Sequence, residues 1–137
     1  MPLALKEKIS RWLWQLLEYR LISPVQPIDL LLPDGSVQDG VLAAVDTQSE
    51  LSSIDRGLVK ELNLKITETT DEAEFVLHGR SKLVPTVSVT FRINGQVRTG
   101  RWAVVQRSQE KNVVSLGKAD LGGFLVEVPE DRASTHE

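Results

Sequence analysis

The sequence predicts a single, mainly β domain that contains one short internal helix and follows an amphipathic helix. Three observations lead to this fold class. Apolar and polar residues alternate along 84–93, as they do on a strand with one buried face. Several short apolar runs lie close together, separated by turn-forming pairs such as Asn94-Gly95. Residues 4–22 instead repeat their apolar side chains every three or four positions, which is the period of a helix.

The composition fits one globular domain and narrows the classes of function. The chain has 137 residues, of which 41% are hydrophobic, and a formal net charge of -3. Because no basic stripe stands out, we expect no nucleic-acid partner. The absence of cysteine excludes disulfides and is compatible with a cytoplasmic location, which we expect. No apolar stretch is long enough to span a bilayer, and charges interrupt any secretory pattern near the N-terminus.

The leading helix is expected over 4–22, within an N-terminal segment that covers 1–23. Ser23-Pro24 ends it, because the residue before a proline avoids helical geometry. Two alternatives remain for what the apolar face of this helix contacts. Packing against protein is the usual fate of such a face, whereas the tryptophans and basic residues of this segment would also suit a membrane surface.

The strands begin after this segment. Strands are expected at 28–32 and 37–45, and the turn Pro33-Asp34-Gly35-Ser36 joins them, since proline presets its first corner and glycine tolerates a positive φ. The continuous apolar run 41–45 predicts a strand covered on both faces. Asp55 can cap a short helix over 56–63.

The pattern of the second half of the chain predicts further strands. A strand is expected at 64–66, then an exposed connection at 67–74 and a short strand at 75–77. The strand at 84–93 turns at Asn94-Gly95, the strongest short hairpin signal, and returns over 97–105. The last two strands are expected at 113–116 and 124–128, and a polar tail follows at 129–137.

Asp46-Thr47-Gln48 is the most informative motif of the chain. It places a carboxylate directly after the apolar strand, with Ser49 and further hydroxyls behind it. Taken alone, an aspartate followed by hydroxyl residues is most often a turn former whose side chain bonds the backbone. Its meaning therefore depends on the segments that accompany it.

Three segments together resemble the retropepsin-like aspartic peptidases, in their bacterial form. They are Val45-Asp46-Thr47-Gln48-Ser49-Glu50-Leu51-Ser52-Ser53-Ile54, the capped helix that follows over 54–64, and Val114-Ser115-Leu116-Gly117-Lys118-Ala119-Asp120-Leu121. The resemblance covers about 26–128. It implies a closed β-domain that acts as a homodimer, in which each subunit supplies one aspartate and a β-hairpin flap covers the cleft. It implies neither a cofactor nor a metal.

The resemblance assigns roles to the turn residues. Asp46 would be catalytic, Thr47 would tie the two turns of the dimer together, and Gln48 and Ser49 would complete the turn. Two carboxylates held close together share one proton, so one acts as base and the other as acid. The family has glycine where this chain has Gln48, and glycine leaves room for a substrate backbone.

Two functional classes follow from this motif. The first is a homodimeric aspartic peptidase that hydrolyses peptide bonds in a peptide or protein substrate. The second is a catalytically silent relative that uses the same fold for peptide binding or protein assembly. His78 and His136 have no companions at metal-ligand spacing, so no metal site is expected. Arg92, Arg98 and Arg101 flank the hairpin and are interpreted as part of an ordinary solvated sheet face.

Overall fold

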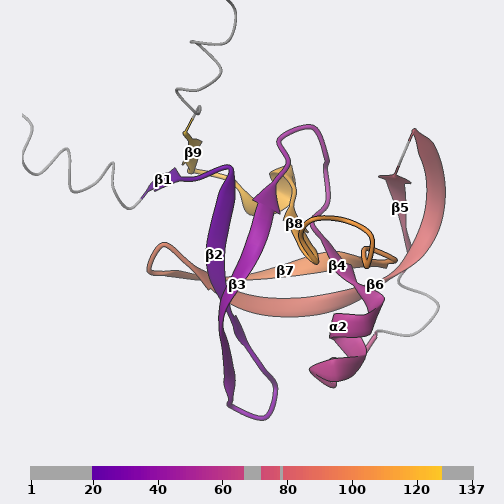
Figure 1. Cartoon of the computed structure of the whole chain (residues 1–137), viewed down its shortest axis with the longest axis horizontal. Coiled ribbons are helices and arrows are strands. Elements are labelled where there is room, and N and C mark those ends of the chain that lie inside the picture. Colours follow the sequence, from indigo (N-terminus) through magenta and orange to yellow (C-terminus); the bar gives the residue numbers. More distant parts are fainter. Residues whose placement is uncertain (1–19, 67–71, 78, 128–137) are drawn as a thin grey trace, which may run out of the picture.

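The computed structural model describes residues 20–66, 72–77 and 79–127, most of which belong to one β-barrel (Figure 1). Its strands are β1 (Leu21–Ile22), β2 (Val25–Leu31), β3 (Val37–Val45), β4 (Ser53–Asp55), β5 (Glu72–Leu77), β6 (Arg80–Ile93), β7 (Gln96–Val105), β8 (Val114–Leu116) and β9 (Leu125–Val126). The helix α2 (Arg56–Glu61) follows β4, and a 3-10 turn, η1 (Lys118–Asp120), follows β8.

The large sheet closes on itself. Its strand order is β2-β3-β8-β4-β7-β6-β5, and an additional pairing joins β2 to β6. The six strands from β2 to β6 in this order therefore form a ring, while β5 extends beyond it next to the curled first half of β6 (Figure 1). The predicted fold class, mainly β with a closed domain and a short internal helix, is confirmed.

The core lies inside this ring. Val87, Val89, Phe91 and Ile93 are all buried, which confirms the alternation expected along β6. The ring of Phe91 packs against Trp102 of β7 with 5.1 Å between centroids. A second apolar cluster lies where β5 meets the barrel, and it consists of Phe75, Val84, Ala103 and Val105 with Leu51 at its side.

The predicted turns and the predicted cap are present. Asn94 and Gly95 have φ values of 50° and 82°, which is the pair of positive angles that a type I′ hairpin turn needs. In the turn between β2 and β3, Gly35 has a φ of 88°. The Asp55 carboxylate accepts a hydrogen bond from the Gly57 N–H at 3.0 Å and so caps α2, whose Val59 is buried.

The structure differs from the prediction at the N-terminal segment. Leu21 and Ile22 form β1, which pairs in parallel with Leu125 and Val126 of β9, so the predicted helix over 4–22 does not extend through its last two positions. The cause is a long-range contact, because pairing with β9 buries Ile22. Residues 4–19 of the predicted helix and the predicted tail at 129–137 lie outside the described residues.

Further differences concern individual strands. Leu42 of β3 is 53% exposed, so the run 41–45 is not covered on both faces; Ala43 points to the core and Leu42 away from it. The expected strand at 64–66 is reduced to one bridge between Ile66 and Val87. β5 begins at Glu72, inside the expected connection. None of the described helices is long and apolar enough to cross a bilayer.

Candidate functional site

Asp46 lies immediately after the last residue of β3. This strand runs parallel to β8, with Val45 opposite Leu116, and the Asp46 N–H donates to the Leu116 carbonyl oxygen at 2.8 Å. The backbone of Asp46 is therefore fixed to the barrel, while its side chain is exposed. This is the position that the sequence predicts: a carboxylate delivered at the end of a strand.

The Asp46 turn (Asp46, Thr47, Gln48 and Ser49) is held by hydrogen bonds from Asp46 itself. Asp46 Oδ1 accepts from the Gln48 N–H at 2.9 Å, and its carbonyl oxygen accepts from the Ser49 N–H at 3.3 Å. Asp46 is thus a turn former as well as an exposed carboxylate. Among the described residues, the non-glycine positions with positive φ are Asn63 and Asn94, so the backbone at Gln48 does not itself require glycine.

The segment behind this turn packs closely against the segment that follows β8. The Lys118 N–H donates to the Ser49 carbonyl oxygen at 2.8 Å, and the Ala119 N–H donates to the Glu50 carbonyl oxygen at 2.9 Å. Gly117 makes this approach possible. A Cβ atom at Gly117 would lie 2.5 Å from the carbonyl carbon and oxygen of Leu51, a distance that real Cβ contacts do not reach. The glycine expected from the family segment therefore has a steric role.

A buried polar cluster lies beneath the turn. The Ser52 hydroxyl donates to Asp120 Oδ2 at 2.5 Å, and the Ser52 oxygen accepts from the Gly117 N–H at 2.9 Å. Ser52 and Asp120 are both buried. Burial raises the pKa of the Asp120 carboxyl, against the opposing effects of the Ser52 hydroxyl and the Arg98 charge.

The buried guanidinium of Arg107 lies next to β4. The Arg107 N–H donates to Asp55 Oδ1 at 2.7 Å, and its guanidinium contacts the Ser53 hydroxyl at 3.3 Å. Burial lowers the pKa of Arg107, and nearby Glu110, Asp46 and Asp55 oppose this effect. The negative charge of Asp46 therefore favours the protonated form of Arg107.

Sequence reasoning missed Ser52, Asp120 and Arg107. Asp120 belongs to the segment 114–121 that resembles the family, without a role of its own, and Arg107 falls between two expected strands. One available signal was the pair Ser52-Ser53 between two apolar residues, which is unusual for an exposed turn. No local signal joins Ser52 to Asp120, because 68 positions separate them.

A hollow of about 390 Å³ separates the Asp46 turn from β5. We call this hollow the flap groove, because β5 and β6 form the hairpin beside it. Its lining residues come from both sides and are Asp46, Gln48, Ser49, Glu50, Leu51, Glu74, Phe75, Val76 and Gly79. The predicted turn residues Asp46, Gln48 and Ser49 are thus brought together in one groove, and Thr47 is exposed beside them.

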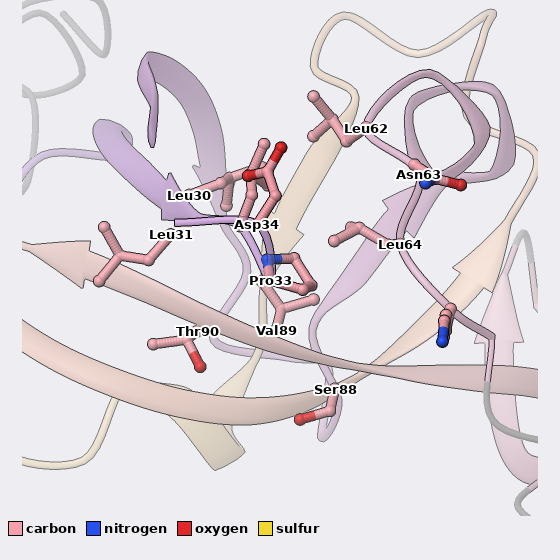
Figure 2. A pocket seen from close by; sticks show the side chains of 12 residues that line it. Leu30, Leu31, Pro33, Asp34, Leu62, Asn63, Leu64, Ser88, Val89 and Thr90 are labelled. Carbon is pink, nitrogen blue, oxygen red and sulfur yellow. The ribbon is translucent and has the colours of Figure 1, made fainter. Parts of the chain in front are cut away.

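A larger hollow of about 630 Å³ has no residue of the Asp46 turn in its lining. Figure 2 shows Leu62 and Leu64, which follow α2, on one side of this space and Leu31 and Pro33 on another, with Ser88 on β6. Five of its twelve lining residues are leucine, and its polar residues, such as Asp34 and Lys65, do not include a carboxylate that directly follows a barrel strand. Size alone therefore does not identify the site, and the chemistry-bearing residues favour the flap groove.

The three arginines near the hairpin do not form a shared patch. Arg92 pairs with Asp29 at 3.4 Å. Arg98 donates to the carbonyl oxygens of Asp120 and Gly122 and lies 4.2 Å from the centroid of the Phe124 ring. Arg101 donates to the Thr86 hydroxyl at 2.8 Å. Each guanidinium therefore has its own partners, as the interpretation without a basic patch expects.

Metal ligation has no support in the described residues. Within 20–66, 72–77 and 79–127, no group of three or more histidine, cysteine, aspartate or glutamate side chains could hold a metal ion. His78 and His136 lie outside these residues. The prediction of no metal and no cofactor stays a prediction.

The comparisons with known proteins give similarity of structure only. No family model and no curated protein sequence matches the chain. Lpg0085 of Legionella pneumophila subsp. pneumophila str. Philadelphia 1, a protein of unknown function (DUF785), is similar with a TM-score of 0.53 and 13% identity, over 78% of this chain and 92% of that one. The foamy viral protease-reverse transcriptase, solved in complex with an RNA/DNA hybrid, is similar with a TM-score of 0.50 and 13% identity, over 82% of this chain and 14% of that one. At such identities the likeness shows a shared fold.

Proposed function

We propose that this protein is a retropepsin-like aspartic peptidase that works as a homodimer and hydrolyses peptide bonds with one Asp46 from each subunit. The observation that carries the proposal is the position of Asp46. Its backbone is fixed to β8, and its exposed carboxylate lines a groove beside a β-hairpin. The structural likeness to a viral protein whose name includes a protease adds support at the level of the fold.

The chemistry needs two carboxylates, and this chain has one such turn. Two Asp46 side chains that meet across a two-fold axis would share a proton, because both cannot ionise cheaply at short distance. The ionised carboxylate would then activate water, and the protonated one would donate to the carbonyl oxygen or to the leaving nitrogen. Since Asp46 and Thr47 are exposed in the single chain, a second copy can reach them.

The groove suits an extended peptide. Its volume of about 390 Å³ is within the usual range of ligand sites. One wall is a strand, β5, and the other is the Asp46 turn. An extended chain that lies between these walls would have its backbone next to the carboxylates.

A catalytically silent, peptide-binding relative is the second candidate, and Gln48 is the observation that favours it. The Gln48 side chain lines the groove at the position where the family has glycine. Displacement of a substrate by about 1 Å can cost on the order of 100-fold in rate. Gln48 would then leave binding in place while it slows or stops hydrolysis.

Cleavage of an unfolded protein substrate across acid to neutral pH separates the two candidates. The peptidase proposal expects cleavage that is fastest at acid pH, that is lost in Asp46→Asn and that is kept in Asp39→Asn, a matched change at an exposed site remote from the groove. If the wild type is inactive and Gln48→Gly gains cleavage, the silent relative is correct. If dimers form but neither protein cleaves, catalysis by Asp46 is refuted.

A further inference from the structure

One edge of the barrel sheet is open next to the flap groove. In the part of the chain that the structure describes, β5 pairs with β6 alone and is the last strand in the sheet order. Figure 1 shows β5 on the side of the curled β6 that faces the rest of the barrel. An extended peptide can pair with such an edge through its backbone, and the side chains of the edge strand then select the side chains of the peptide.

The two faces of β5 differ in chemistry. Phe75 is 6% exposed and packs in the second apolar cluster, so its neighbours Glu74 and Val76 point to the opposite face. Val76 is 62% exposed there. Across the hairpin, Glu74 pairs with Leu83 and Val76 with Ser81. The face of β5 opposite Phe75 therefore presents a carboxylate and, two positions later, an apolar side chain.

The Glu74 carboxylate is held in place and has like charges across the groove. The Ser81 hydroxyl donates a hydrogen bond to Glu74 Oε1. Glu50 and Asp46 line the opposite wall of the same groove. The Glu50 carboxylate pairs with Lys118 at 3.6 Å, but both side chains are largely exposed, so this pair is weak. Lys82 pairs with Phe75 and therefore lies on the other face of the hairpin.

We propose that Glu74 and Val76 determine the specificity of the flap groove: they select an extended peptide with a lysine or arginine beside Glu74 and an apolar residue two positions away. The proposal deepens the proposed function and rests on it, because it assumes that a peptide occupies this groove. Residues directly opposite on neighbouring strands interact most strongly, and opposite charges there attract while like charges repel. Replacing lysine by glutamate in the peptide should weaken binding about 3- to 10-fold.

The test measures peptide binding to the Asp46→Asn protein, so that the peptide stays intact. The probes are fluorescent eight-residue peptides without proline that are identical except for one central lysine or glutamate. A valine two positions away on each side allows either strand direction. Fluorescence anisotropy at low ionic strength gives the affinities, since salt screens exposed charges. The same peptides are then measured with Glu74→Lys and with Glu61→Lys added. Glu61 lies on α2, is exposed and gives the same change in net charge.

The expected result is tighter binding of the lysine peptide, a reversed order in Glu74→Lys and an unchanged order in Glu61→Lys. Equal affinity for both peptides, or an order that Glu74→Lys leaves unchanged, would overturn the specificity proposal while peptide binding itself still supports the proposed function. If neither peptide binds at concentrations up to about 1 mM, the proposed function and the specificity proposal both fail.

Discussion

Ser52→Ala removes the centre of the buried cluster beneath the Asp46 turn. The Ser52 hydroxyl donates to Asp120 at 2.5 Å, and its oxygen accepts from the Gly117 N–H at 2.9 Å. Alanine leaves one carboxylate oxygen and one N–H without these partners in a buried region. Each unsatisfied buried group costs about 1–3 kcal/mol, so the free energy of unfolding should fall by about 2–6 kcal/mol for the two groups. For a domain of this size this is a decrease in Tm of about 8–24 °C.

Urea and thermal unfolding, followed by circular dichroism, measure this change. Ser88→Ala is the matched control, because Ser88 is an exposed serine on β6, and its effect should stay within about 0.5 kcal/mol. A loss of less than about 0.5 kcal/mol in Ser52→Ala would refute the reasoning. It would mean that water or a rearranged backbone satisfies both groups without cost.

Two further predictions concern the same region. Gly117→Ala places a Cβ 2.5 Å from the Leu51 carbonyl, so we expect it to lower the free energy of unfolding by about 1–3 kcal/mol. The control is Gly122→Ala, because a Cβ at Gly122 has open space around it. Equal effects of the two changes would contradict the steric argument. Burial raises the pKa of Asp120 in the folded protein above its ordinary value of 3.8, so folding favours the protonated form. Its contribution is fully present below that ordinary value and is lost as the pH rises through the folded pKa, which means that stability should fall with rising pH in this window. Asp120→Asn should flatten this slope in unfolding measured from acid to neutral pH, and an unchanged slope would count against it.

Local signals predicted the elements whose residues decide their own structure. The apolar run before Asp46 ends where β3 ends, and Asp55 caps α2 as expected. The Asn94-Gly95 turn adopts the positive φ angles that these two residues tolerate best. Asp46 could be found because its strand and its turn are contiguous in the sequence.

The remaining features depend on contacts between distant segments. Ile22 is in a strand because β9 lies beside it, and no pattern near Ile22 predicts that partner. Polar residues at the start of β6 hid its extension to Arg80, since pairing with β5 rather than burial keeps them extended. Ser52 and Asp120 meet only because the barrel closes, so neither could be identified as a buried pair from the sequence.

The central claim is that two copies of the Asp46 turn meet across a two-fold axis. Thr47 is exposed next to Asp46, and the chain contains no cysteine, so Thr47→Cys introduces a unique thiol. A disulfide between two subunits requires Cα atoms about 4.4–6.8 Å apart. Oxidation of Thr47→Cys should therefore give a covalent dimer on a non-reducing gel. Oxidised Ser88→Cys, whose thiol is remote from the turn, should run as a single chain on the same gel. Thr47→Cys that still sediments as a dimer but forms no covalent dimer under oxidation would contradict the account.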